Sequence, residues 1–250
     1  MDKIKISVVS YLNSKPFIYG LQHSTIIDAI DIQLDIPSVC AQKLIKEEVD
    51  IGLIPVAVLP ELKEYYIITD YCIGAKGKVA SVMLYSCVPV NEINQIVLDY
   101  QSRTSVTLIK VLAVNFWKIN PEWKNAEIGY EDKIEGTTAG VIIGDRTFGL
   151  EDQYTYSYDL AEEWQKFTGL PFVFACWVAN KKISEAFIRA FNTALKSGLD
   201  NRSVLINELA KDNYRTDVVN YLYNSIKYDY GTAQKKALEL FLSYILKLQV

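Results

Sequence analysis

Histidine is almost missing from this 250-residue sequence, in which His23 is the single example. The four cysteines are not clustered, so a zinc or iron site would have to be built almost entirely from carboxylates. The same scarcity argues against Ser-His-Asp or Cys-His catalysis unless His23 takes part, and His23 lies in YGLQHSTI, where we expect a solvated helix end. We therefore expect no metal site.

Several other signatures are also lacking. No GxGxxG or Walker-type loop is present, so no nucleotide cofactor is indicated. The 26 Lys and Arg residues are scattered among 30 Asp and Glu residues, without the basic stripe of a nucleic-acid binder. No apolar run approaches the ~20 residues that span a bilayer, and MDKIKISVVSYLN has no signal-peptide pattern. We expect a cytoplasmic protein that binds neither nucleic acid nor membrane; its oligomeric state is not indicated.

The cysteines are few and far apart. None forms a CxxC pair, and each lies in an apolar or strand-like context. Buried free thiols are the better interpretation than disulfides or a redox role. This expectation concerns Cys40, Cys72, Cys87 and Cys176.

Half of the residues are hydrophobic, which is enough for a substantial core. Strand-like runs such as KISVVS, IDIQLDIP and DIGLIPVAVL alternate with helical stretches, a pattern that predicts an α/β fold. We expect helices from Phe17 to His23, from Ser38, as N-cap, to Glu48, and from Ser184, Thr216 and Thr232 onward. If the chain forms two lobes, we place crossovers near 86–90 and 177, so that residues 1–87 and 177–250 form one lobe and residues 88–176 the other.

Polar turns follow three of the predicted strands: YLNS, YQSRTS and GDR. In α/β sheets, ligands bind beyond the carboxyl ends of the strands, where helices present their amino termini. In two lobes, the first turn would face the other two across a ligand cleft.

The YQSRTS turn has the features of an anion pocket. A helix that begins near Thr104 leaves about four unpaired N–H groups and a positive dipole end. The hydroxyls of Ser102, Thr104 and Ser105 and the Arg103 guanidinium lie beside it. The alternative is an ordinary helix cap with a solvent-facing arginine.

The YLNS turn offers both donors and acceptors. Asn13 suits a hydroxyl or ether oxygen, and Ser10 and Ser14 can donate to a carboxylate. The alternative is an Asx turn that leads into a helix with Pro16 in its first turn. Ser81, in VASVMLYS, is a candidate of the same kind, although serines in strands commonly bond to the backbone.

The GDR turn supplies the one acid that we place at a cleft. Asp145 could act as a base or merely orient nearby N–H groups. Trp177 could wall the site, although the alternation in FVFACW favours a core position for its aromatics.

Taken together, these motifs resemble those of the MqnA family, the chorismate dehydratases of the futalosine route to menaquinone. The resemblance rests on six blocks in order: VSYLNSKPF, DIGLIP, VASVMLYS, LDYQSRTSV, VIIGD and DLAEEWQKFTGLPFVFACWVA. One departure is VAV after Pro55, where the family would have a serine, so no ligand contact is assigned to Val56.

The resemblance implies the two-lobed type II fold of the periplasmic binding proteins, with a ligand cleft between the lobes. It also implies elimination of water from chorismate, without a cofactor, to give 3-[(1-carboxyvinyl)oxy]benzoate. We expect Asn13 and Ser81 to hold the oxygens around the departing hydroxyl, and Asp145 or the enolpyruvyl carboxylate of the substrate to accept the proton. The residues expected to bind substrate are Ser10, Tyr11, Ser14, Ser102, Arg103, Thr104, Ser105, Gly144 and Trp177.

Two alternatives stay open. The same fold most often captures small ligands for transport, so the chain could bind a small carboxylate without catalysis. It could also be the sister enzyme of the pathway, which forms dihydroxynaphthoate, although the YLNS and SRTS blocks fit the dehydratase better.

Overall fold

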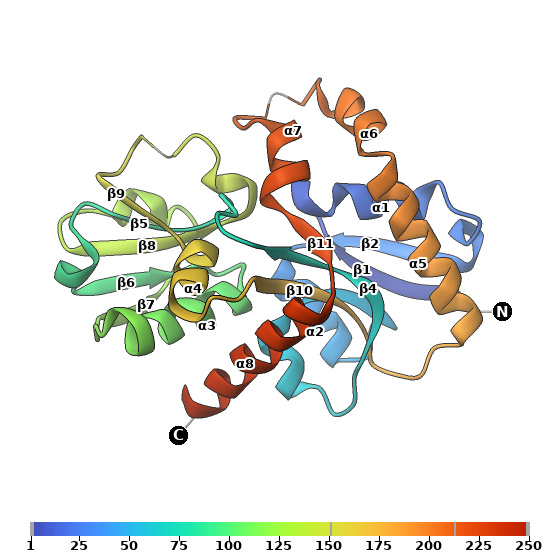
Figure 1. Ribbon diagram of the computed structural model, residues 1–250, viewed down its shortest axis with the longest axis horizontal. Coiled ribbons are helices and arrows are strands. Elements are labelled where there is room, and N and C mark those ends of the chain that lie inside the picture. The colour runs from blue at the N-terminus through green and yellow to red at the C-terminus, as the bar shows by residue number, and fades with distance from the viewer. Residues whose placement is uncertain (1–2, 151, 213, 249–250) are drawn as a thin grey trace.

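The computed structural model describes residues 3–150, 152–212 and 214–248 and consists of two lobes side by side (Figure 1). The first lobe is built on a six-stranded sheet in the order β11-β4-β10-β3-β1-β2. β1 pairs in parallel with β2 and β3, whereas β10 pairs antiparallel with β3 and β4. The strands are β1 (Ile4–Val9), β2 (Ile30–Asp35), β3 (Ile51–Pro55), β4 (Tyr66–Ala75), β10 (Phe172–Ala179) and β11 (Lys227–Asp229).

The second lobe is built on a five-stranded sheet in the order β7-β6-β8-β5-β9. β6 pairs in parallel with β7 and β8, and β5 pairs antiparallel with β8 and β9. The predicted α/β, two-lobed fold is confirmed. The strands are β5 (Val82–Ser86), β6 (Gln95–Leu98), β7 (Glu122–Asn125), β8 (Thr138–Ile143) and β9 (Tyr156–Asp159).

The lobe boundaries differ from the prediction. β5 lies in the second sheet, although residues 1–87 were assigned to the first lobe, and β10 lies in the first sheet, although residues 88–176 were assigned to the second. The chain therefore crosses between the sheets in segments 76–81 and 169–171. Both strands are buried along their whole length, and a fully buried strand carries no local signal for which sheet it joins.

Helices cover the two sheets (Figure 1). They are α1 (Lys15–Gln22), α2 (Pro37–Ile45), α3 (Arg103–Leu112), α4 (Leu160–Thr168), α5 (Glu185–Asp200), α6 (Arg202–Leu209), α7 (Val218–Asn220) and α8 (Thr232–Leu248). α3 and α7 continue into π-helical turns, η5 (Ala113–Trp117) and η8 (Tyr221–Ser225). The 3-10 turns are η1 (Leu12–Ser14), η2 (Ile27–Ala29), η3 (Val56–Glu61), η4 (Val90–Glu92), η6 (Tyr130–Lys133) and η7 (Gly144–Thr147).

Two of the expected helices differ in detail. α2 begins one residue before Ser38, at Pro37, and has Ile36 as its N-cap without a side-chain bond, so Ser38 is not the cap. Proline fits the first turn because its missing N–H would have no partner there. The helix expected from Thr216 is only the short α7 followed by η8. His23 is exposed at the end of α1, as predicted.

Close contact between α1 and α5 fixes the segment that follows β1. A Cβ atom at Gly20 would lie 2.1 Å from the Ala194 carbonyl oxygen, and one at Gly198 would lie 1.9 Å from the Pro16 carbonyl oxygen. Only glycine permits backbones to approach this closely. Because α1 starts directly after the YLNS turn, this packing positions the turn at the edge of the sheet.

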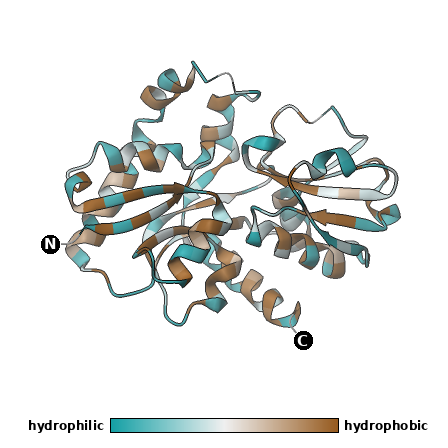
Figure 2. Ribbon diagram, turned by 180° about the vertical axis from the view of Figure 1, so that it is seen from behind, coloured by the Kyte–Doolittle hydropathy of each residue, from teal (hydrophilic) through white to brown (hydrophobic). Residues whose placement is uncertain are grey.

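Hydrophobic residues concentrate along the strands, and the helices alternate between hydrophobic and hydrophilic residues (Figure 2). All four cysteines are free, and Cys40, Cys72 and Cys176 are buried as predicted. The prediction is wrong for Cys87, which is exposed because β5 ends at Ser86. None of the helices in the described ranges is both long and apolar enough to cross a membrane.

Candidate functional site

A cavity lies between the two lobes, where the carboxyl ends of parallel strands from both sheets meet. Its volume is about 530 Å³ when the part that opens to solvent is included. Polar residues of all three predicted turns line it together with Ser81: Tyr11, Asn13, Ser14, Ser102, Thr104, Ser105 and Gly144. Its apolar wall consists of Val9, Pro37, Pro55, Ile73, Val79, Val82, Ile143, Phe174 and Ala175.

The YLNS turn forms η1 directly after β1 and presents Asn13 to the cavity. The Asn13 side-chain oxygen accepts a hydrogen bond from Ser14 Oγ at 3.1 Å. The Tyr228 hydroxyl, from β11, donates to the Asn13 backbone carbonyl at 2.9 Å. One hydrogen bond thus fixes the side-chain amide of Asn13, and another fixes its backbone carbonyl.

Ser81 lies opposite this turn, in the crossover that precedes β5. Its Oγ accepts a 2.7 Å hydrogen bond from the hydroxyl of Tyr221, which is buried in η8. The same hydroxyl is 3.5 Å from Asn13 Nδ2 and accepts from it. Burial raises the pKa of Tyr221 well above its ordinary value, so the hydroxyl stays protonated. No sequence pattern indicated Tyr221 and Tyr228, because they lie more than 130 residues after the residues that they contact.

Asp159 shapes the backbone next to Ser81. One of its carboxylate oxygens accepts the N–H groups of Val79 and Ala80, each at 2.7 Å, and the other accepts N–H groups of the first turn of α4. Ala80 has a left-handed conformation, with φ of 63°, which this pair of bonds supports. Burial raises the pKa of Asp159 to about 6, against the lowering effect of the four backbone N–H groups. An N-cap pattern before LAEE could have identified this residue.

α3 begins at the cavity, so the positive end of its dipole lies there. The helix starts one residue earlier than expected, with Ser102 as N-cap, whose Oγ accepts the Ser105 N–H at 3.0 Å. The Thr104 hydroxyl donates to the Phe174 carbonyl at 3.1 Å and accepts the Ala57 N–H at 3.2 Å. Its hydrogen is therefore committed to joining α3 to the first lobe.

Arg103 does not line the cavity. Its guanidinium forms an ion pair with Glu61 at the surface, where both side chains are about two-fifths exposed. The prediction that Arg103 binds substrate is therefore not supported by its position. In α3, position 103 faces away from the cleft because positions 102, 104 and 105 face it.

Three more predicted residues lie outside the cavity lining. Both oxygens of Asp145 accept the Leu12 backbone N–H, at 3.1 and 3.2 Å, which joins the GDR turn to the YLNS turn. Burial raises the pKa of Asp145 above its ordinary value. Ser10 is exposed and uses its N–H to pair with Asp35. Trp177 is fully buried against Phe17 and Phe191, so the core interpretation of FVFACW is the correct one.

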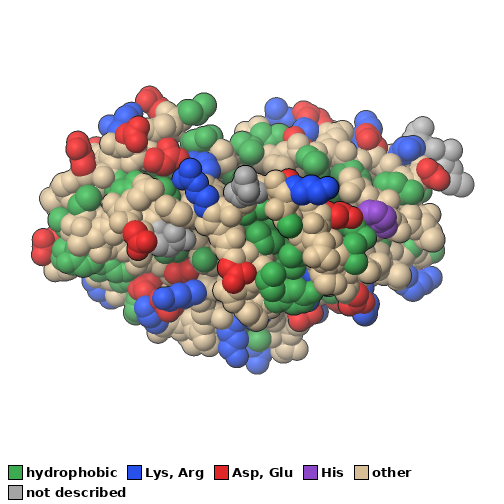
Figure 3. Space-filling view, turned by 90° about the horizontal axis from the view of Figure 1, so that it is seen from above, with side chains coloured by type: hydrophobic (Ala, Val, Ile, Leu, Met, Phe, Trp, Pro, Cys, Tyr) green, Lys and Arg blue, Asp and Glu red, His purple; other side chains and the backbone are tan. Residues whose placement is uncertain are grey.

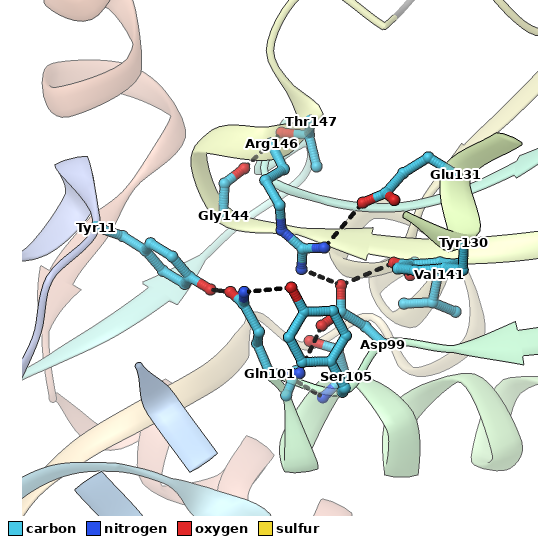
Figure 4. Close-up of polar contacts among 12 residues, drawn as sticks. Tyr11, Asp99, Gln101, Ser105, Tyr130, Glu131, Val141, Gly144, Arg146 and Thr147 are labelled. Atoms are coloured by element: carbon cyan, nitrogen blue, oxygen red, sulfur yellow. Dashed lines mark hydrogen bonds and ion pairs between the residues drawn. The ribbon is translucent and has the colours of Figure 1, made fainter. Parts of the chain in front are cut away.

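Tyr11 extends from the first lobe across to the second (Figure 4). Its hydroxyl donates to Gln101 Oε1, and its ring lies against Gly144, where an added Cβ would come within 2.7 Å of the ring. The Gln101 carbonyl also accepts the Ser38 N–H at 3.1 Å. These contacts hold the two lobes closed.

A buried ionic cluster supports the far end of this contact. Asp99 accepts the Gln101 N–H at 2.7 Å, the Tyr130 hydroxyl at 2.8 Å and a charge-assisted bond from Arg146 (Figure 4). Burial raises the pKa of Asp99, although Arg146 acts in the opposite direction. Asp99, held by Tyr130 and Arg146, therefore fixes the turn that carries Gln101.

The cavity offers donors without cations. Across residues 3–150, 152–212 and 214–248, the lining includes no Lys, Arg or His, and no group of three or more His, Cys, Asp or Glu side chains is arranged to hold a metal ion. On the face in Figure 3, acidic and basic side chains are interspersed and form no continuous basic surface. The site is suited to a small anion held by hydroxyls, an amide and a helix end.

Comparison with known proteins gives one family and one fold. The model of a family described as menaquinone biosynthesis matches residues 4–247. Protein AF1704 from Archaeoglobus fulgidus is similar in structure, with a TM-score of 0.76, 13% identity, and coverage of 99% of this chain and 97% of that one. An ABC transporter structure from Parabacteroides distasonis gives a TM-score of 0.67 at 18% identity, covering 99% and 93%.

A third solved structure describes the fold in its title. The CA3427 gene product of Candida albicans, described as having the generic periplasmic binding protein fold, gives a TM-score of 0.63 at 10% identity, with 99% of this chain and 90% of that one covered. At these identities, the structural likeness shows the fold alone. It confirms the two-lobed type II fold that the family resemblance implied.

Proposed function

This chain belongs to the menaquinone biosynthesis family, and from that premise and the chemistry of its cleft we propose that it is a chorismate dehydratase. Membership of the family gives the chain a role in making menaquinone. The proposal adds the reaction, in which chorismate loses water and becomes 3-[(1-carboxyvinyl)oxy]benzoate.

The chemistry suits a cleft without strong bases or metals. Chorismate carries two carboxylates, an ether oxygen and a hydroxyl at C4 of its ring. Loss of the C4 hydroxyl and the C3 hydrogen, as one water molecule, leaves an aromatic ring, so the reaction is strongly downhill. The protein then needs chiefly to position the substrate and to stabilise the charge that develops.

The observation that carries the proposal is the meeting of two half-sites at one cavity: the N-terminus of α3 from one lobe, and the Asn13 turn of the other lobe with Ser81. The first is suited to the ring carboxylate, onto which negative charge spreads when the C3 proton leaves. Donors at Ser102, Ser105 and the helix end would stabilise that charge as an oxyanion hole does, and one such donor typically contributes ~2.7 to 4 kcal/mol to the barrier. Asn13 and Ser81 would hold the departing hydroxyl.

For the proton, we propose the enolpyruvyl carboxylate of the substrate as the acceptor. Asp145 is the other candidate, but both of its oxygens accept the Leu12 N–H, and it lies outside the cavity lining. An Asp145 carboxylate that holds this bond serves to join the two turns.

The test is incubation of the purified protein with chorismate, followed by ultraviolet absorbance and mass analysis. We expect one product, lighter than chorismate by one water. An Asn13→Ala variant should lose most of the activity, whereas Asn94→Ala, which changes an exposed amide of the second lobe, should retain it. Chorismate that is bound but recovered unchanged would favour a binding protein, and failure to bind chorismate would reopen the case for the dihydroxynaphthoate-forming sister enzyme.

A further inference from the structure

The C-terminal segment from η8 to β11 reaches back to the cleft. It places two tyrosine hydroxyls behind the polar half-site, that of Tyr228 on the Asn13 carbonyl and that of Tyr221 between Asn13 and Ser81. Tyr221 is only 2% exposed, and Phe148 of the second lobe packs edge-on against its ring, with the centroids 5.1 Å apart. Its hydroxyl is thus fixed in place behind two residues that line the cavity, and Tyr221 itself is not part of the lining.

We propose that Tyr221 is a positioning residue, which aims the Ser81 hydroxyl hydrogen at the departing hydroxyl of the substrate. The inference rests on the proposed dehydration. Tyr221 belongs to none of the three polar turns, and its contact with Phe148 is one of several that join the two lobes.

The direction of the hydrogen bonds supports this role. An amide nitrogen can only donate, so the Tyr221 oxygen accepts from Asn13 Nδ2 and its single hydrogen goes to Ser81 Oγ. Ser81 therefore uses a lone pair for Tyr221 and keeps its own hydrogen for the cavity that it lines. Hydrogen bonds in such a chain polarise one another, which makes the last hydroxyl a better donor.

This series of hydrogen bonds also couples Asn13 to Ser81, the two residues that we expect to face the departing hydroxyl. Ser14 donates to Asn13, Asn13 donates to Tyr221, and Tyr221 donates to Ser81, at 3.1, 3.5 and 2.7 Å. Asn13 belongs to the first lobe, whereas Ser81 lies in the crossover and its carbonyl accepts the Gly144 N–H of the second lobe at 2.9 Å. Tyr221 therefore sets the position of Ser81 relative to Asn13. If the Tyr221 hydroxyl were removed, the Ser81 hydroxyl would be free to rotate and to donate its hydrogen to another acceptor.

The test compares Tyr221→Phe, Ser81→Ala and the double variant with wild type in chorismate dehydration. We expect Tyr221→Phe to lower kcat by about 3- to 10-fold, the loss of one hydrogen bond, with little change in KM. In the Ser81→Ala background, the same substitution should change kcat by less than about 2-fold, because the Ser81 hydroxyl through which Tyr221 acts is already absent. Tyr223→Phe, which removes an exposed hydroxyl from the same turn, should behave as wild type.

An unchanged kcat in Tyr221→Phe, with wild type active, would overturn the inference and leave the proposed function intact. An equal loss in both backgrounds would overturn it too, since Tyr221 would then act other than through Ser81. If wild type does not dehydrate chorismate, both proposals fail. Should Tyr221→Phe not fold, the structure of wild type with an unreactive chorismate analogue that keeps the C4 hydroxyl decides: Ser81 Oγ must contact both Tyr221 and that hydroxyl, and loss of either contact would refute the role.

Discussion

Replacement of Gly144 by alanine tests whether closure of the cleft depends on the Tyr11 ring. Gly144 has a φ of 66°, and an added Cβ would come within 2.7 to 2.9 Å of three atoms of the ring. The residues belong to different lobes, so this clash arises only when the lobes are closed. The backbone strain, in contrast, exists whether the cleft is open or closed.

The two effects have different sizes and different consequences. The left-handed conformation costs alanine about 1–2 kcal/mol, which lowers the melting temperature by roughly 2–8 °C in a chain of this size. Displacement of the ring breaks the hydrogen bond from Tyr11 to Gln101, worth about 0.5–1.5 kcal/mol. Because that loss falls on the closed state, we expect kcat/KM for chorismate to fall by about 3- to 10-fold.

Gly169→Ala is the matched control. Gly169 has a φ of 73° with no neighbour within 4 Å of its added Cβ, so its variant carries the same strain without the clash. Both variants should lose similar stability, and only Gly144→Ala should lose kcat/KM. In a Tyr11→Ala background, where no ring remains, Gly144→Ala should cost no further activity. Equal kcat/KM for Gly144→Ala and Gly169→Ala would refute this account of closure.

Three further predictions follow from individual side chains. Arg103→Ala should leave kcat/KM within about 3-fold of wild type, because its exposed pair with Glu61 contributes little; a hundredfold rise in KM would place the guanidinium on the substrate. Asp145→Asn keeps an oxygen for the turn N–H, so kcat should stay within about 3-fold, and a loss above a hundredfold would identify Asp145 as the base. Between pH 4 and 6 the folded protein retains a proton on Asp159 that the unfolded chain has released, so its unfolding free energy should fall by about 3 kcal/mol relative to Asp159→Asn as pH rises through this window. A difference between the two urea-unfolding curves that does not change with pH would contradict the raised pKa.

The location of the cavity was predictable from local patterns. Polar residues follow the ends of β1 at Val9, β6 at Leu98 and β8 at Ile143, and the carboxyl ends of parallel strands share an edge. That rule predicts that Asn13, Ser102 and Gly144 lie close together, and all three line one cavity. The rule says which turns meet, and it does so without knowledge of contacts between distant segments.

The groups that support the site were not predictable in this way. Tyr221 lies 140 residues after Ser81 in the sequence and contacts it only through the tertiary fold. The direction of a side chain was likewise hidden: Arg103 and Thr104 are neighbours in one polar turn, but one pairs with Glu61 at the surface and the other bonds inside the cleft. The placement of β5 and β10 failed for the same reason, because the choice of a neighbouring strand is a long-range matter.

The most direct test of the central claim is a crystal structure of the protein with 3-[(1-carboxyvinyl)oxy]benzoate bound. The account predicts one carboxylate within hydrogen-bond distance of the first turn of α3, and the rest of the ligand between that turn and the Asn13 and Ser81 side chains. A product molecule that contacts only one lobe, or that pairs with a cationic side chain outside this cavity, would contradict it.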